Sequence, residues 1–266
     1  MNPGAGSEHE PADSPASTTR DSMAAQIRAA AGFLTILPVM PISPARDETV
    51  AASLKWFPAI GFALGAMICV IDFLLGRWFG SFIRSLLTIA IVTAITGAVH
   101  LDGLADTADA LGAGRDRARA LTILRDSRIG SFGAIALFFA LALKIVTLAS
   151  IAAPRRYVAL YFALGLSRWA MIAVAQRLDY LRAEGAGSAL LTSERNSPLP
   201  FATLITAVAL LSVLSWRVIA AVLAALAIVF LLRAFYRRWL GGVTGDLIGA
   251  CGELVELAVL LAMSVK

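Results

Sequence analysis

Residues 131–153, SFGAIALFFALALKIVTLASIAA, decide the class of fold, because Lys144 is the single charged side chain in the whole run. A helix needs about 20 predominantly apolar residues to cross the hydrocarbon core of a bilayer. The apolar stretch 199–232 is too long for one crossing, so we divide it at Arg217. We expect an all-α integral membrane protein with about seven transmembrane helices, the others lying near 56–75, 85–101, 157–176, 199–216, 218–232 and 245–265.

The composition of the chain agrees with a membrane location. Hydrophobic residues make up 59% of the 266 residues and charged residues 15%, and the mean hydropathy is +0.79. A soluble domain has about 45–50% apolar and about 25% charged residues. The chain is therefore more apolar than a soluble core requires, and we expect membrane lipid to surround it. The two cysteines, Cys69 and Cys251, lie in apolar runs and exclude a disulfide framework or a cysteine-rich zinc site.

Two segments near the N-terminus differ from the rest. Residues 1–22 are rich in Pro, Ser, Gly and acidic residues, and we expect a disordered polar tail there. The apolar run at 29–42 is too short to span and is broken by Pro38 and Pro41, so we expect an interfacial or re-entrant segment. Residues 23–266 then form a single polytopic transmembrane domain.

The distribution of Lys and Arg predicts the topology. The N-terminal segment and the loops at 102–130, 177–198 and 233–244 fall on one side with fifteen of these cations, against six on the other side. Cytoplasmic loops are enriched in Lys and Arg. The loop at 102–130 is therefore expected to face the cytoplasm, and the net charge of +5 needs no nucleic-acid partner.

The most informative motif begins at His100, in the stretch HLDGLADTADALG. Asp102, Asp106 and Asp109 stand at i, i+4 and i+7, which places them on one face of a helix. A divalent cation removes the repulsion between such carboxylates, and oxygen ligands suit Mg²⁺ or Mn²⁺. The alternative is a solvated loop in which Asp102 caps a helix. His100 either contacts a substrate or only sits at the membrane interface.

A basic stretch, RDSRIGSFG at 125–133, follows and enters the third long apolar run. Arg125 and Arg128 flank Asp126 and Ser127 just before small residues at an expected helix N-terminus. Such an end attracts phosphate, and Arg adds bidentate contacts. The alternative is an ordinary basic loop beside the membrane. Together the acidic and basic motifs indicate phosphoryl or phosphodiester transfer, in which charge must be neutralised.

Further ionisable residues fall inside the expected spans. Asp246 and Glu253 are seven apart at the start of the last span, beside the close-packing pair Gly245 and Gly249. Intramembrane carboxylates are costly and usually functional, although Asp246 could be a helix cap. Lys144 and Arg168 either face a polar cavity, pair with the carboxylates or extend toward an interface. Asp72 also falls within an expected span.

The two central motifs resemble the signature of the bacterial cobalamin synthases, also called adenosylcobinamide-GDP ribazoletransferases. The matching stretches are HLDGLADTADAL and ILRDSRIGSFGAIAL, with further matches that bring the resemblance to about residues 26–262. The opening DGLA at 102–105 is also similar to the Asp-Gly-x-x-Ala opening of the CDP-alcohol phosphatidyltransferases. Asp106 stands where that family has Arg, so this second similarity is one of chemistry only.

The resemblance implies an enzyme of the bacterial inner membrane with its active site facing the cytoplasm. A hydroxyl of α-ribazole, or of its 5′-phosphate, would attack the phosphate on adenosylcobinamide-GDP, and GMP would leave. The resemblance also implies Mg²⁺ and allows association with other enzymes of corrinoid synthesis. On this basis we expect Asp102, Asp106 and Asp126 to hold the metal ion. Asp109 would accept the proton or be a further metal ligand, and Arg125 and Arg128 would stabilise charge. The expected substrate contacts are His100, Ser127, Arg168, Asp246 and Glu253.

Two other functions compete with this interpretation. A transporter or cation-binding membrane protein would place its acidic residues deep within the spans. A prenyl- or phosphatidyl-transferase would use an Asp-rich loop with Mg²⁺ on a lipid diphosphate. The position of the acidic motif at a membrane boundary, beside a basic loop, favours a soluble phosphorylated substrate.

Overall fold

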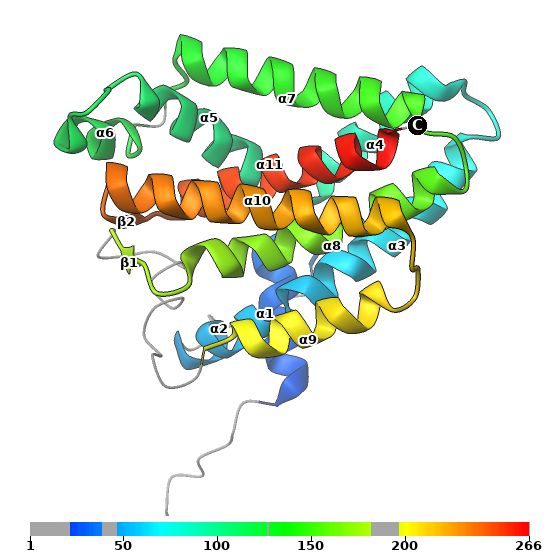
Figure 1. The fold of residues 1–266 in the computed structure, drawn as a ribbon, viewed down its shortest axis with the longest axis horizontal. Helices are drawn as coiled ribbons and strands as arrows, with labels where there is room; N and C mark the ends of the chain where they lie inside the picture. The colour runs from blue at the N-terminus through cyan, green and yellow to red at the C-terminus, as the bar shows by residue number, and fades with distance from the viewer. Residues whose placement is uncertain (1–21, 39–46, 127, 182–196, 266) are drawn as a thin grey trace, which may run out of the picture.

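The computed structural model describes residues 22–38, 47–126, 128–181 and 197–265, and these are almost entirely helical (Figure 1). The expected tail at 1–22 lies outside the described residues except for Ser22, which caps the first helix by accepting from the Ala25 amide. The elements are α1 Met23–Leu34, α2 Asp47–Ser53, the 3₁₀ turn η1 Leu54–Trp56, α3 Phe57–Leu75, α4 Ser81–Ile95, α5 Val99–Leu111, α6 Arg117–Ile123, α7 Ser131–Ser150, α8 Arg155–Ala175, β1 Asp179–Tyr180, α9 Leu199–Leu210, α10 Trp216–Trp239, β2 Gly242–Val243 and α11 Gly245–Ser264.

The expected all-α multi-pass class is confirmed, with fewer full-length spans than the seven expected. In the described residues five helical stretches are long and apolar enough to cross a membrane, or six if α4 and α5 form one bent span. The helix α9 has 12 residues and falls short of the length that a bilayer requires. The five stretches are Glu48–Leu75, Ser131–Ser150, Arg155–Ala175, Trp216–Trp239 and Gly245–Ser264.

The helix α8 forms the centre of the bundle. In its most apolar 18-residue stretch 83% of the residues are buried, and α3, α10 and α11 pack around it (Figure 1). By contrast, only 22% of the residues in the corresponding stretch of α10 are buried. The exposed side chains of α10 are large and apolar, including Leu223 and Phe230. An apolar exterior of this kind suits contact with lipid.

A sharp bend separates α4 from α5. The two helices meet at 91°, where Gly97 (φ +63°) and Ala98 (φ +57°) take left-handed backbone conformations. The expected span at 85–101 is therefore not one continuous helix, because consecutive left-handed residues cannot continue a right-handed helix. Gly97 is also required for space, since a Cβ there would lie 2.7 Å from the Ile36 side chain. The bend makes the acidic motif part of a separate helix that runs across the end of the bundle.

The long apolar stretch at 199–232 does divide into two helices. The break covers residues 211–215, and Ser215 caps α10 by accepting from the Val218 amide at 3.3 Å. Arg217 therefore lies in the first turn of α10 and not in the break. The helix continues to Trp239, so the cations expected in a loop from 233 onward stand on its last turns.

A buried ion-pair network ties α3, α4 and α8 together. The Arg156 Nη2 donates to Asp72 Oδ1 at 2.7 Å, Thr88 donates to the same oxygen at 2.8 Å, and Arg84 pairs with the other oxygen. Asp72 and Arg156 are fully buried. The network lies where α3 ends and α8 begins, so it belongs to the end of the bundle opposite α5.

The described parts of the segments after α5, α8 and α10, which were expected on one side of the membrane, lie together at one end of the bundle. The short strands β1 and β2 pair in parallel, joining the chain after α8 to the chain after α10. The Trp239 indole donates to the Gly114 carbonyl at 3.0 Å, which links α10 to the turn after α5. This end also holds the start of α11 and the acidic helix α5 (Figure 1).

Candidate functional site

The acidic motif lies on α5, which packs against the first turn of α11. Asp102, Asp106 and Asp109 therefore stand on successive turns of one helix, as expected. The close packing depends on Gly103, because a Cβ there would lie 2.7 Å from the Asp246 carbonyl oxygen. The absence of a side chain at 103 thus brings Asp102 and Asp246 from two helices to one place.

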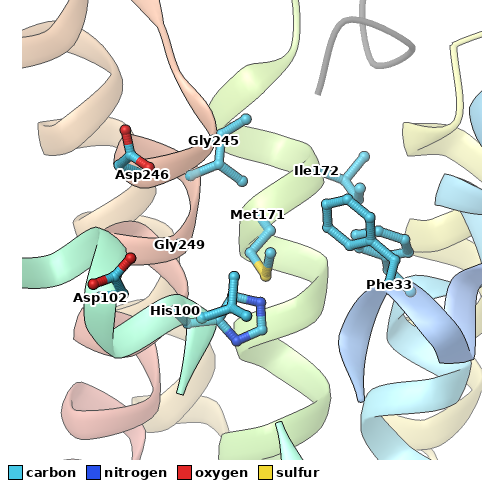
Figure 2. A pocket seen from close by; sticks show the side chains of 11 residues that line it. Phe33, His100, Asp102, Met171, Ile172, Gly245, Asp246 and Gly249 are labelled. Carbon is cyan, nitrogen blue, oxygen red and sulfur yellow. The ribbon is translucent and has the colours of Figure 1, made fainter. Parts of the chain in front are cut away.

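A cavity of about 130 Å³ opens beside this contact. Asp102 and Asp246 lie on one side of it, Phe33 and Ile172 on the other, and His100 between them (Figure 2). The sequence predicted the three polar residues as site residues and missed the apolar wall. The complete lining is Phe33, Phe57, Val99, His100, Asp102, Met171, Ile172, Gly245, Asp246, Ile248 and Gly249.

Asp246 is not the cap of α11. That position belongs to Thr244, whose hydroxyl accepts from the Leu247 amide at 3.4 Å. The same hydroxyl lies 3.3 Å from Asp246 Oδ2. Asp246 therefore accepts from Thr244 and lines the cavity instead of capping α11, which favours the functional interpretation over the capping one.

His100 is buried at the base of the cavity. The residue is 3% exposed, and neither ring nitrogen has a hydrogen-bond partner among the described residues. Gly249 of α11 permits this placement, since a Cβ there would lie 3.2 Å from the His100 Cα. Buried polar groups are normally paired. The two ring nitrogens are an exception, and they have almost no accessible surface, so they face neighbouring side chains and not the open part of the cavity.

Asp109 makes a contact that the sequence did not predict. Its Oδ2 accepts from the Gly130 amide at 2.7 Å and its Oδ1 from the Gly133 amide at 2.9 Å. The carboxylate thus caps the N-terminus of α7, where Gly130 has no side chain to do so. This N-terminus was expected to bind phosphate, but a carboxylate of the chain already occupies two of its donors.

The basic stretch before α7 lies at the surface. Arg125 and Arg128 are exposed, and Arg128 Nη2 pairs with Asp126 Oδ2 at 2.7 Å. This hydrogen-bonded pair holds the pKa of the Asp126 carboxyl below its ordinary value. Ser127 lies outside the described residues. The expected metal set is not preassembled, because among the described residues no three His, Cys, Asp or Glu side chains could together hold an ion.

A second buried ion-pair network lies among α7, α8 and α11. Lys144 Nζ donates to Glu253 Oε2 at 2.5 Å and to Glu256 Oε1 at 2.9 Å, and Arg168 Nη1 reaches Glu256 Oε2 at 3.4 Å. Lys144 and Arg168 therefore pair with carboxylates, one of the alternatives left open. Glu253 and Arg168 were expected to contact substrate. In the structure Glu253 pairs with Lys144, and Arg168 pairs with Glu256, because buried charges need to be compensated.

Comparison with known proteins identifies the family. The family model described as cobalamin-5-phosphate synthase matches residues 26–264. The chain belongs to the cobalamin-5-phosphate synthase family. No solved structure matches it.

Curated relatives in the cobalamin-5-phosphate synthase family are identical to this chain at about a third of the aligned positions. An adenosylcobinamide-GDP ribazoletransferase of Desulforamulus reducens is 35% identical over 242 residues, covering 90% of this chain and 95% of that protein. The proteins of the same name from Syntrophobacter fumaroxidans and Ectopseudomonas mendocina are each 36% identical, covering 88% and 90% of this chain and 95% and 98% of their own lengths.

Of the site residues that the sequence interpretation missed, Glu256 could have been predicted and the apolar wall of the cavity could not. Glu256 stands three residues after Glu253, so the two share a helix face and could have been considered together. Phe33, Met171 and Ile172 lie in ordinary apolar stretches, where nothing distinguishes a cavity wall from a core.

Proposed function

We propose that the chain is an adenosylcobinamide-GDP ribazoletransferase of the bacterial inner membrane, acting at the cavity between α5, α8 and α11. The observation that carries this proposal is the meeting at one cavity of Asp102, from the acidic motif on α5, and Asp246, from α11. The names of the curated relatives support the choice of reaction. The rival transporter function would need a pathway through the bundle, whereas the buried charges of α7, α8 and α11 compensate one another.

In the proposed reaction a ribose hydroxyl of α-ribazole, or of its 5′-phosphate, attacks the phosphorus attached to cobinamide. A new oxygen–phosphorus bond forms, the bond to GMP breaks, and the hydroxyl proton passes to a base. The products are adenosylcobalamin, or its 5′-phosphate, and GMP. Catalysis of such a transfer consists mainly of positioning and charge stabilisation, which fits a site built from carboxylates and nearby arginines.

The carboxylates of α5 suit a magnesium ion shared with the substrate. Mg²⁺ usually binds one or two protein carboxylates together with substrate phosphates, so a site without three preassembled ligands is of the appropriate kind. Asp102 and Asp106, one turn apart on α5, would hold the ion on the diphosphate. There it would neutralise charge on the phosphate oxygens. Asp126 would join them only by releasing Arg128.

We assign the proton acceptor to Asp246 in place of Asp109. Both oxygens of Asp109 are hydrogen-bonded to the start of α7, and Asp109 is not part of the cavity lining. Asp246 does line the cavity, with the Thr244 hydroxyl donating to its Oδ2. Asp109 then acts as a positioning residue that fixes α5 against α7. Arg125 and Arg128 lie in the exposed segment between these helices and would approach the phosphates of the bound nucleotide.

The cytoplasmic orientation of the site rests on the distribution of cations. The described parts of the segments after α5, α8 and α10, which belong to the Lys- and Arg-rich set, lie at the end of the bundle that holds the cavity. The positive-inside rule places that end in the cytoplasm, where the nucleotide substrate is soluble.

The direct test of the proposed function is a turnover assay on the purified protein in liposomes. Adenosylcobinamide-GDP and α-ribazole 5′-phosphate are supplied, and GMP release and the corrinoid product are measured. We expect GMP and cobalamin 5′-phosphate in equal amounts. A folded protein that releases no GMP, and instead consumes a lipid diphosphate, would replace this proposal by a prenyl- or phosphatidyl-transferase function.

A further inference from the structure

Three arginines, which we call the arginine cluster, meet where α8 and α10 end. Arg233 and Arg237 stand one turn apart on α10 and so share a face of that helix. The Arg233 Nη1 donates to the Ala173 carbonyl in the last turn of α8 at 3.3 Å, and Arg177 lies two residues beyond that helix. Arg177 and Arg237 are both close enough to Arg233 to repel its charge.

The fold holds these like charges together. The strand β1 begins two residues after Arg177 and pairs in parallel with β2, which follows the end of α10 (Figure 1). The two strands approach closely because Gly242 has no side chain, and a Cβ there would clash with the Asp179 carbonyl oxygen. The ends of α8 and α10 are therefore fixed side by side, and their arginines stay near one another.

The arginine cluster has no counter-charge among the described residues. None of its three members forms an ion pair with a described carboxylate. Arg177 and Arg237 are exposed and Arg233 is partly buried, so an incoming ligand can reach them. Uncompensated positive charges attract anions, and guanidinium groups bind phosphate oxygens through paired hydrogen bonds. The cluster therefore favours a ligand that carries a phosphate group.

An apolar stripe on α10 leads directly to the arginine cluster. It consists of Leu223, Leu226 and Phe230, which are 60%, 45% and 71% exposed, and Arg233 and Arg237 continue the same helix face. Half of the hydrocarbon core of a bilayer is about 15 Å thick, which corresponds to about ten residues of helix. The distance along α10 from Arg233 to Leu223 therefore matches the depth of one leaflet.

We propose that the arginine cluster and the α10 stripe together bind an anionic phospholipid of the cytoplasmic leaflet, with its phosphate at the arginines and one acyl chain along the stripe. Basic pockets between transmembrane helices on the cytoplasmic side are known to bind anionic lipid headgroups. A second copy of the chain in the same orientation fits less well, because its own arginines would lie at the same level and repel these. None of the residues involved lines the cavity, so the lipid site goes beyond the proposed reaction and does not depend on it.

Lipid titration followed by native mass spectrometry tests the charged part of this site. The full chain in a nonionic detergent is titrated with phosphatidylglycerol, and with zwitterionic phosphatidylcholine that carries the same acyl chains. We expect the double variant Arg177→Gln and Arg237→Gln to bind phosphatidylglycerol about 30-fold more weakly than the wild-type protein. The control is the double variant Arg119→Gln and Arg238→Gln, which removes two exposed charges at the same end of the bundle and should weaken binding by less than about threefold. Phosphatidylcholine should bind the wild-type protein more weakly than phosphatidylglycerol.

A single variant tests the apolar part of the site. Phe230→Ala removes an exposed ring from the stripe, so it should weaken phosphatidylglycerol binding about fivefold and leave thermal unfolding of the lipid-free protein unchanged. Excess inorganic phosphate should displace little of the lipid, because it has no acyl chain. If Phe230→Ala has no effect, or if inorganic phosphate displaces the lipid, the arginines bind a soluble phosphate and the proposal is wrong. Equal weakening by the two double variants, or equal affinity for the two lipids, would overturn it as well.

Discussion

Asp102, Asp106 and Asp109 share one face of α5 but meet different surroundings. Their spacing was enough to predict that they lie on one helix, because that depends only on 3.6 residues per turn. It could not show that Asp109 would cap α7, since the capping donors, Gly130 and Gly133, lie more than twenty residues away. Thr and Asp are both preferred N-cap residues, so the sequence offered Thr244 and Asp246 as candidate caps of α11, and only the structure shows that Thr244 is the cap.

At the residue scale, we expect Asp109→Asn to act mainly on stability. An amide presents only one acceptor atom to the two N–H groups of α7, so the free energy of unfolding should fall by about 1–3 kcal/mol. Thermal unfolding in detergent would measure this loss, with Asp126→Asn as the control for an exposed carboxylate. A variant that unfolds like the wild-type protein but loses all turnover would restore Asp109 as the proton acceptor.

The helices themselves were largely predictable, because their apolar runs are long and uninterrupted. The bend between α4 and α5 was not, since one of its two left-handed residues is Ala98, a residue type that favours helices. The short α9 was also missed, because hydropathy does not show where an apolar run leaves the helical conformation.

At the scale of elements, Gly103→Leu should separate α5 from α11. The added side chain would meet the Asp246 backbone, which lies within 3 Å of the Cβ position, and neither element can yield without moving a helix. We expect a loss of turnover of at least tenfold in protein that still inserts into membranes. The control is Gly80→Ala, where an added Cβ meets nothing within 4 Å. Full activity of Gly103→Leu would show that the site does not depend on this helix contact.

Also at this scale, Asp72→Asn should destabilise the bundle without altering the chemistry. Removing one partner of a buried ion pair typically costs about 3–5 kcal/mol, and here Arg84 and Arg156 would both lose their carboxylate. Denaturation should show this loss, while turnover per folded molecule remains near that of the wild-type protein. A large fall in turnover per folded molecule would mean that the opposite end of the bundle takes part in the reaction.

For the whole molecule, composition was sufficient to predict a membrane protein but not how its charges are compensated. Lys144 and its partners Glu253 and Glu256 are more than a hundred residues apart, and only the packing of α7 against α11 brings them together. The family resemblance supplied the chemistry, and the fold then showed which of the predicted residues meet at one cavity.

At the scale of the whole molecule with the proposed Mg²⁺ ion, we expect chelation of divalent cations to abolish GMP release. The carboxylates of α5 would otherwise repel the diphosphate of the donor. Titration of Mg²⁺ back into EDTA-treated liposomes should restore turnover, and Ca²⁺, which is larger and less strict in geometry, should restore less. Unchanged turnover in excess EDTA would show that the reaction does not need a divalent cation.

The measurement that tests the central claim most directly compares GMP release by the wild-type protein and by Asp246→Asn in Mg²⁺-containing liposomes. The claim is that transfer takes place at the cavity between α5, α8 and α11. It predicts that Asp246→Asn inserts and unfolds like the wild-type protein but releases GMP at least a hundredfold more slowly, in keeping with the loss of a general base. Turnover by this variant within a fewfold of the wild-type rate would contradict the claim and place the reaction elsewhere in the protein.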